Sequence, residues 1–244
     1  MTVLKGFVDK EVSTVKRMVL SIEGREGKGK STLALSAPDP IVLFDFDYGL
    51  EGVIDSFLEA GKKILVPETS FKYHDVTDPN EWVVLWERYK TDFLRALDCD
   101  KVRTIVVDTG TEAWELIRLA RHGKLTQIMP HHYGPMNAEF RDLFRKVYDS
   151  DKNFVVTHKL KAKYVNDKRT DEYEMAGFGD TPYTVQVAVR VWRKHPEDGG
   201  DFGLTIQKCR PNAGLEGSDL VEPMSTFQFL ASTVFEGSDL EDWE

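Results

Sequence analysis

The chain has 244 residues, of which 41% are hydrophobic and 30% are charged, and its formal net charge is −9. This composition is ordinary for a folded globular protein and too apolar for wholesale disorder, and the length favours one large domain. The negative charge excludes a surface coated in cations for tight duplex binding, since phosphate neutralisation needs Lys and Arg. A local basic segment remains possible, because residues 151–169 contain six cations and two aspartates.

Two absences in the sequence limit where the protein acts. No stretch approaches the ~18 consecutive apolar residues of a membrane span, and residues 1–10 lack the apolar run of a secretory signal. We therefore expect a cytoplasmic protein, in the host cytoplasm if it is viral, with no membrane partner. Cys99 and Cys209 are far apart in the chain and predict neither a disulfide framework nor a zinc site.

Apolar runs that end at glycines, prolines or acidic residues predict five strands, at residues 17–23, 41–47, 63–66, 102–108 and 153–158. Helices are expected directly after the first strand, from Trp82 to Leu97, through Trp114, and over residues 135–148. The apolar residues from Trp82 to Leu97 recur at a period near 3.6, so this aromatic stripe is interpreted as core, with base stacking as the alternative. Strands alternating with helices imply a mainly parallel sheet with helices on both faces.

The last third of the chain follows a different pattern. Residues 163–173, 184–194 and 202–209 are predicted strands separated by turns, and we expect them to extend the sheet in antiparallel fashion. The domain expectation is a single domain over residues 1–230, followed by an acidic flexible tail over residues 231–244.

A glycine-rich segment after the first strand carries the clearest chemical signal. Residues 24–31 read GREGKGKS, which matches GxxxxGK[ST] and lies between a predicted strand and a predicted helix. The glycines allow backbone N–H groups to surround a β-phosphate, Lys30 reaches the β- and γ-phosphates, and Ser31 ligates Mg²⁺. The alternative is a surface turn, and Lys28 is as readily a solvated side chain as a phosphate contact. The predicted nucleotide-binding residues are Gly24, Arg25, Glu26, Gly27, Lys28, Gly29, Lys30, Ser31 and Thr32.

A carboxylate at the end of a later strand indicates the same chemistry. Asp108 closes the apolar strand of residues 104–107, where a carboxylate holds the hydration shell of Mg²⁺ opposite Ser31. The alternative is an aspartate that caps the following helix through the turn of residues 109–111. Ser31 and Asp108 are thus the predicted metal site, with Asp108 acting through water.

On these motifs the chain resembles the RecA-like core ATPases, and within them the small phage-type RecA-core proteins of single-strand annealing and recombination. The resemblance covers most of residues 17–210, although short motifs carry it. It implies an α/β fold with a RecA-like P-loop NTPase core, a mainly parallel central sheet flanked by helices, and C-terminal antiparallel strands. It also implies ATP and Mg²⁺ as cofactors, whereas the residues alone do not separate ATP from GTP.

The resemblance implies two further catalytic residues. An acidic residue at the end of the second strand polarises the attacking water in this family. Asp47 stands where the family usually has glutamate, so its shorter side chain must bring the carboxylate closer or hydrolysis will be slow; Asp45 and Glu51 compete with it, and a polar loop without a catalytic role is the alternative. His158 stands where the family often has glutamine and is expected to sense the γ-phosphate, unless the local backbone satisfies it.

Two cations near the end of the chain resemble an intersubunit device. Lys208 and Arg210 match the Lys-x-Arg finger that ring-forming RecA-like proteins insert into the neighbouring subunit's site. Such cations offset charge that develops on the transferred phosphoryl group. The resemblance therefore implies a homo-oligomer, either a ring or a filament, and the alternative is a pair of solvated cations.

The segment after the fifth strand alternates cations with other residues. As a strand it places Lys159, Lys161 and Lys163 on one face with Tyr164 beside them, which suits a track for a single-stranded DNA backbone. The resemblance points the same way, because DNA loops follow the fifth strand in the family. The alternative is a sheet edge protected by lysines.

Three functions are compatible with these residues. The first is an ATP-dependent ssDNA-binding ATPase of phage type that acts in DNA recombination or single-strand annealing. The second is a P-loop kinase of a nucleotide or other small molecule, with Arg118 and Arg121 as candidates for its lid. The third is a non-catalytic nucleotide-dependent partner protein. The acidic tail, with Trp243, is expected to recruit a replication or recombination protein or to occupy the DNA channel.

Overall fold

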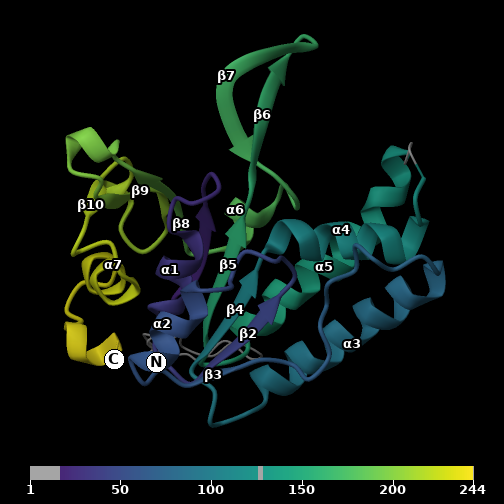
Figure 1. The fold of residues 1–244 in the computed structure, drawn as a ribbon, viewed down its shortest axis with the longest axis horizontal. Helices are drawn as coiled ribbons and strands as arrows, with labels where there is room; N and C mark the ends of the chain where they lie inside the picture. Colours follow the sequence, from purple (N-terminus) through teal and green to yellow (C-terminus); the bar gives the residue numbers. More distant parts are fainter. Residues whose placement is uncertain (1–16, 126–128, 244) are drawn as a thin grey trace, which may run out of the picture.

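The computed structural model describes residues 17–125 and 129–243, which form a central sheet with helices on both faces (Figure 1). Residues 1–10, in which no secretory signal was expected, lie outside the described residues. Within the described part of the chain, eight strands form the sheet in the order β10-β9-β8-β1-β5-β4-β2-β3. Their bounds are β1 (Val19–Glu23), β2 (Ile41–Asp45), β3 (Ile64–Leu65), β4 (Thr104–Asp108), β5 (Asn153–His158), β8 (Val187–Arg193), β9 (Phe202–Cys209) and β10 (Asp219–Val221).

Strands β8, β1, β5, β4, β2 and β3 run parallel to one another, and β9 and β10 continue the sheet in antiparallel fashion. The predicted mainly parallel α/β sheet with an antiparallel C-terminal extension is thus confirmed. The prediction for residues 184–194 is wrong in direction, since β8 pairs parallel with β1 from Leu20↔Val187 to Glu23↔Arg190. The chain crosses the sheet before it forms β8, so this strand enters from the same end as β1.

The helices divide between two hydrophobic clusters, one on each face of the sheet. Helices α3, α4 and α5 cover one face, and α1, α7 and the turn η4 cover the other, as Figure 1 shows. The helical bounds are α1 (Lys30–Leu35), α2 (Val53–Glu59), α3 (Pro79–Leu97), α4 (Gly110–His122), α5 (Tyr133–Tyr148), α6 (Thr181–Thr184) and α7 (Phe227–Val234). Single 3-10 turns are η1 (Pro130–His132), η2 (Pro196–Asp198), η3 (Ala213–Leu215) and η4 (Leu240–Trp243).

The long helix α3 begins and packs as its sequence predicts. The Asp78 side chain accepts a hydrogen bond from the backbone N–H of Asn80, and proline occupies the first helical turn, where a missing N–H costs nothing. Trp86 and Phe93 are fully buried against the sheet. The aromatic stripe is therefore core, and its alternative role in base stacking is wrong.

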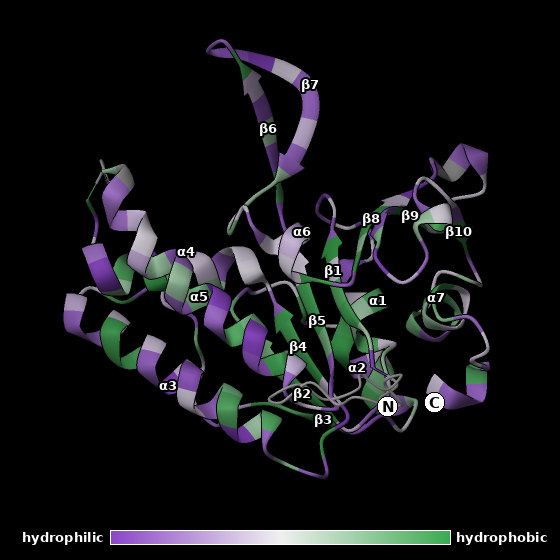
Figure 2. Cartoon of the chain, turned by 180° about the vertical axis from the view of Figure 1, so that it is seen from behind, coloured by the Kyte–Doolittle hydropathy of each residue, from purple (hydrophilic) through white to green (hydrophobic). Residues whose placement is uncertain are grey.

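Residues 160–175, here named the arm, form a separate two-stranded ribbon of β6 (Leu160–Val165) and β7 (Lys168–Met175). The arm projects from the body in Figure 1, and Figure 2 shows it as mostly hydrophilic. Asn166 and Asp167 have φ values of 51° and 60°, the left-handed conformations of a tight two-residue hairpin turn. The predicted single strand over residues 163–173 is therefore wrong, because a turn divides it.

The end of the chain packs against the body. The boundary expected at residue 231 falls inside α7, and the Trp243 side chain is only 1% exposed. Its ring stacks on Phe235 at a centroid distance of 5.3 Å, and its indole N–H donates to the Ser238 hydroxyl at 3.1 Å. The expectation of a flexible tail is corrected by this packing, since one large aromatic side chain anchors an otherwise acidic segment. Because the indole of Trp243 is buried, it is not exposed for contact with a partner protein or with the DNA channel.

Two further features concern the chain as a whole. Among the helices of the described residues, none combines the length and the apolarity that a membrane crossing requires. Cys209 is buried, Cys99 is partly buried, and both are free thiols.

Candidate nucleotide-binding site

A pocket of about 1060 Å³ opens at the carboxyl ends of the parallel strands. Ligands of open α/β sheets bind at this edge, where loops from several strands meet. The pocket contains every predicted nucleotide-binding residue from Gly24 to Thr32, together with Asp47, Asp108 and Lys159. The structure thus brings together residues that are far apart in the chain, from Gly24 in the P-loop to Phe202 on β9.

The P-loop needs glycine at specific positions. Gly27 and Gly29 have φ values of 67° and 89°, a backbone conformation that other residues rarely adopt. A Cβ atom on Gly24 would lie 2.5 Å from Cγ2 of Val191 on β8, so the loop packs directly on the neighbouring strand. Gly29 is the N-cap of α1, and the first N–H groups of this helix are available to an anion.

Lys30 lies across the loop that precedes it. Its Nζ donates to the backbone carbonyl of Arg25 at 3.0 Å. Burial lowers the pKa of Lys30, and nearby Asp108 opposes that shift. A partly desolvated ammonium held over the P-loop is suited to bind phosphate oxygens, because the charge is only weakly screened there.

Asp108 lies directly behind the P-loop helix. The Ser31 hydroxyl donates to one of its carboxylate oxygens at 2.7 Å, and the Thr157 hydroxyl donates to the other. Burial raises the pKa of Asp108, which is 5% exposed, and both hydrogen bonds oppose the shift. Hydroxyl and carboxylate oxygens are the ligands that Mg²⁺ prefers, so Ser31 and Asp108 fit a magnesium ion. Asp108 does not cap the following helix, which was the alternative. Thr109 is the N-cap of α4, and its side chain accepts a hydrogen bond from the backbone N–H of Glu112 at 3.2 Å.

Of the three acidic candidates Asp45, Asp47 and Glu51, Asp47 alone lines the pocket in the described structure. Its carboxylate forms an ion pair with Nζ of Lys159 at 2.8 Å. Burial opposes ionisation of Asp47, but the hydrogen bonds from Lys159 and from the Tyr48 backbone outweigh it and lower the pKa. Asp45 accepts from the backbone N–H of Asp47 at 3.0 Å and pairs with Lys72 at 3.4 Å, so it supports the loop from behind.

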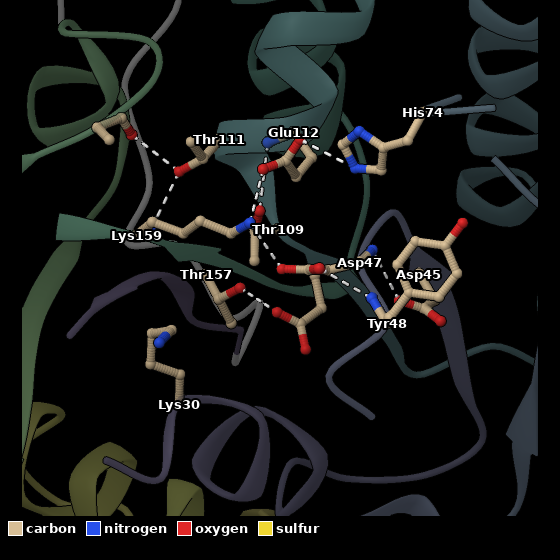
Figure 3. A network of polar contacts seen from close by, with 12 residues as sticks. Lys30, Asp45, Asp47, Tyr48, His74, Thr109, Thr111, Glu112, Thr157 and Lys159 are labelled. Atoms are coloured by element: carbon tan, nitrogen blue, oxygen red, sulfur yellow. Dashed lines mark hydrogen bonds and ion pairs between the residues drawn. The ribbon is translucent and has the colours of Figure 1, made fainter. Parts of the chain in front are cut away.

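Lys159 is the centre of a polar network that Figure 3 shows from close by. Besides Asp47, its Nζ contacts Glu112 at 2.6 Å. Glu112 also accepts from the Tyr73 hydroxyl and lies 3.7 Å from Nε2 of His74. The predicted row of three lysines is therefore divided: Lys159 faces the pocket, and the other two lie on the arm.

The structure does not bring His158 to the pocket. Its ring is fully buried, Nδ1 lies 3.2 Å from the Ala176 carbonyl, and its Cε1 is 2.9 Å from the position of a Cβ on Gly110. The reason is strand alternation, since neighbouring residues of β5 point to opposite faces and Thr157 is the one that reaches Asp108. The local backbone thus satisfies one ring nitrogen, Nδ1, whereas the buried Nε2 has no hydrogen-bond partner in the described part of the chain.

Lys208 and Arg210 also lie away from the pocket of their own chain. Because β9 runs antiparallel to β8, its last residues lie beside the first residues of β8, at the end of the strands opposite the P-loop. Nζ of Lys208 donates to the carbonyls of Pro182 and Val185, and Arg210 donates to the carbonyl of Tyr183 at 2.9 Å. The Arg210 side chain is exposed, and its insertion into a neighbour's site stays a prediction.

The other predicted nucleic-acid residues lie on the arm. Lys161 pairs with Glu174 at 3.2 Å and Lys163 with Glu172 at 2.6 Å, while Tyr164 is 63% exposed. Over residues 160–175 four cations balance four carboxylates, so the arm carries no net charge. DNA binding by this row stays a prediction and would require the lysines to exchange their partners.

Several residues of the site were not predicted, and Thr157, Glu112, Tyr173 and Phe202 are among them. Thr157 could have been predicted from strand alternation, because the residue before His158 faces the opposite side of β5. Glu112 gave no signal, since it lies one turn into a helix. Tyr173 and Phe202 belong to strands that reach the P-loop only in the folded chain: the Arg25 guanidinium packs over the Tyr173 ring at 4.2 Å, and Phe202 lines the pocket.

A second hollow of about 250 Å³ adjoins the P-loop beside α1. It shares Lys28, Gly29, Thr32 and Phe202 with the larger pocket and is also lined by Glu222 and Pro223. The two cavities are therefore neighbours along the P-loop.

The arginines considered for a kinase lid are engaged elsewhere. Arg118 pairs with Glu115 on its own helix, and Arg121 pairs with Glu87 and Glu139. Neither arginine lines the pocket of the described residues.

The fold and the site together define a P-loop NTPase of RecA-like architecture. A strand, a glycine loop and a helix present a lysine and a hydroxyl, and β5 is inserted between the P-loop strand β1 and the strand that ends at Asp108. The chain belongs to the AAA domain family, whose model matches residues 16–187.

Structural comparison finds similar chains at low sequence identity. The RadB recombinase is 12% identical with a TM-score of 0.48, and the match covers 84% of this chain and 86% of that chain. A KaiC-like protein from the hyperthermophilic archaeon Pyrococcus horikoshii OT3 is 12% identical with a TM-score of 0.45, and the match covers 84% of each chain. Comparison with curated protein sequences finds no match.

Proposed function

We propose that the protein binds ATP with Mg²⁺ in the P-loop pocket and hydrolyses it, and that this activity drives work on single-stranded DNA in recombination or annealing. The observation that carries the proposal is the 2.7 Å hydrogen bond between Ser31 and Asp108 beneath Lys30. A hydroxyl and a carboxylate held together behind a phosphate-binding loop are the ligand pair of a nucleotide-bound magnesium ion.

Each residue of the pocket has a separate task in this reaction. The P-loop amides and Lys30 hold the β- and γ-phosphates, and Ser31 and Asp108 hold Mg²⁺, which neutralises phosphate charge when bound. Asp47 lines the same pocket and orients the attacking water. Thr157 fixes the Asp108 carboxylate through its hydroxyl.

The second hollow is the proposed site of the nucleotide base. It begins where α1 carries Thr32, beside which we place the α-phosphate. The Phe202 ring offers a flat apolar surface on which a purine can stack. Adenine rather than guanine is proposed from the RecA-like resemblance.

The arm is the proposed DNA contact. Tyr164 is exposed near its tip, and Lys161 and Lys163 lie on the same strand. Base stacking on an aromatic ring together with lysine contacts to phosphates is the common mode of sequence-tolerant ssDNA binding.

Calorimetric titration with ATP, GTP and ADP, with and without Mg²⁺, tests the nucleotide proposal. We expect magnesium-dependent ATP binding that Lys30→Ala and Asp108→Asn each weaken by about tenfold or more, since one phosphate or metal contact contributes at least ~1.4 kcal/mol. Lys90→Met is the control, because it removes one lysine charge from α3, outside the pocket. Wild-type protein without magnesium-dependent affinity for any nucleoside triphosphate would contradict the proposal.

Hydrolysis assays with and without ssDNA test the second half. Stimulation by ssDNA that declines as salt rises supports an ssDNA-dependent ATPase, because phosphate contacts release counterions. Phosphate transfer to a small acceptor would replace the proposal with a kinase, and tight binding without turnover would replace it with a nucleotide-dependent partner protein.

A further inference from the structure

Lys159 lies directly opposite the start of the P-loop. Strands β1 and β5 are paired to their last residues, Glu23 and His158, and the backbone N–H of Gly24 donates to the His158 carbonyl at 3.4 Å. The next residue along the chain is Lys159, which lines the nucleotide pocket. Its backbone is thereby tied to the strand edge from which the phosphate-binding loop departs.

Both ends of this residue are held. The backbone N–H of Lys159 donates to the Thr111 hydroxyl at 3.0 Å, and its carbonyl accepts from Ala176 at 2.8 Å. The ammonium bridges Asp47 at 2.8 Å and Glu112 at 2.6 Å. The side chain is nonetheless 40% exposed, so its ammonium is open to the pocket.

The electrostatics favour an anion between Lys159 and Lys30. Lys30 and Lys159 both line the nucleotide pocket, so two positive charges repel each other across it. A γ-phosphate between them would relieve that repulsion. The γ-phosphate would also compete with Asp47 for the ammonium of Lys159. The Asp47 carboxylate could then accept a hydrogen bond from the attacking water.

We propose that Lys159 is a catalytic residue of the NTPase reaction, which contacts the γ-phosphate from within the same chain and thereby releases Asp47 to act on the attacking water. This inference rests on the proposed ATP hydrolysis and names a residue that the resemblance assigns to DNA. Glu112 is the positioning residue, because it retains one contact to the ammonium while Asp47 is released.

The reaction balances with these groups. The water oxygen forms a bond to the γ-phosphorus, and the bond between that phosphorus and the β,γ-bridging oxygen breaks. The electron pair leaves with ADP, and the water proton passes to Asp47. Lys159 and Lys30 face the phosphoryl oxygens on which negative charge is concentrated.

Discrimination between nucleoside triphosphate and diphosphate tests the inference. ADP lacks the phosphate that Lys159 would contact, so Lys159→Met should weaken binding of the non-hydrolysable analogue AMP-PNP by about tenfold or more while ADP binding changes less than about threefold. Single-turnover hydrolysis should fall with it, and Lys159→Arg should restore part of both. Lys90→Met serves again as the control, since Lys90 likewise joins two carboxylates, Glu87 and Glu139.

Glu112→Gln moves the same measurement in the opposite direction. The variant removes the negative charge that competes with the γ-phosphate for Lys159, but its amide oxygen can still accept from the ammonium and keep it in position. The preference for AMP-PNP over ADP should therefore rise. This variant keeps the test decisive if Lys159→Met lowers the melting temperature. An unchanged preference in that case would contradict the inference.

Three results have different meanings for the two proposals. If wild-type protein binds and hydrolyses ATP but Lys159→Met keeps its full preference for AMP-PNP and its rate, the inference is overturned and the proposed function stands. If Lys159→Met loses only the ssDNA-stimulated part of the rate, Lys159 belongs to the DNA contact and the inference is equally overturned. If wild-type protein binds no triphosphate, the proposed function itself fails.

Discussion

At the scale of single residues, His158 shows how a buried side chain links the fold to pH. Burial lowers its pKa from 6.5 to about 4, although the hydrogen bond to the Ala176 carbonyl raises it. The unfolded chain therefore takes up a proton near pH 6.5, whereas the folded chain resists protonation until about pH 4. The contribution of the neutral His158 to the free energy of unfolding is therefore present above about pH 6.5. It is lost as the pH falls toward about 4, by on the order of 3 kcal/mol.

Substitution of this histidine should flatten the pH dependence. In His158→Asn the amide N–H₂ can still donate to the Ala176 carbonyl, but no proton is taken up between pH 6.5 and about 4. Urea unfolding at about pH 7 and about pH 5 measures the free energy of unfolding of both proteins. The difference between the two pH values should be smaller in the variant, and an equal difference would show that another group controls acid unfolding.

At the scale of elements, the arm is a nearly independent unit. Its main contacts with the body are the packing of Arg25 on Tyr173, a hydrogen bond from Arg190 to the Tyr173 carbonyl at 3.2 Å, and the pairing of Ala176 with Lys159 at its base. None of these buries a large apolar surface. The arm can therefore change or be lost without removing the core that supports the P-loop.

Excision of the arm should separate DNA binding from nucleotide binding. Replacing residues 161–174 by a short glycine turn is expected to leave magnesium-dependent ATP affinity within about threefold, because the P-loop and Asp108 lie in the body. Binding to single-stranded DNA should be lost, and Tyr164→Ala alone should weaken it by about tenfold, in line with ~1–3 kcal/mol for one stacked base. Electrophoretic and calorimetric titrations measure the two affinities, and full DNA binding without the arm would place the contact elsewhere.

At the scale of the whole molecule, the expected oligomer depends on Arg210, which is exposed at the end of the strands opposite the P-loop. If a neighbouring chain receives this residue, Arg210→Ala should keep nucleotide binding and lose hydrolysis. A mixture with Lys30→Ala chains should then regain activity, because a mixed interface pairs an intact pocket with an intact Arg210. Steady-state hydrolysis of the mixture measures this, and no gain over the separate variants would count against a contribution from the neighbour.

Local sequence patterns determined much of this protein. Each apolar run from residue 17 to residue 158 predicted a strand that the structure contains, and the period of α3 predicted its buried face. The glycine loop predicted Lys30 and Ser31 in one pocket with Asp108. These features depend on steric rules and on burial of apolar side chains, which act between residues close in sequence.

The tertiary structure decided what those rules leave open. The direction of β8, the division of the arm by Asn166 and Asp167, and the burial of Trp243 all depend on contacts between distant segments. The same holds for Lys159, whose position after β5 is compatible with DNA or with nucleotide until Asp47 and Glu112 are brought beside it. The sequence determines the charge of a side chain and its alternation along a strand. Its partner is determined by the packing of strands and helices that are far apart in the chain.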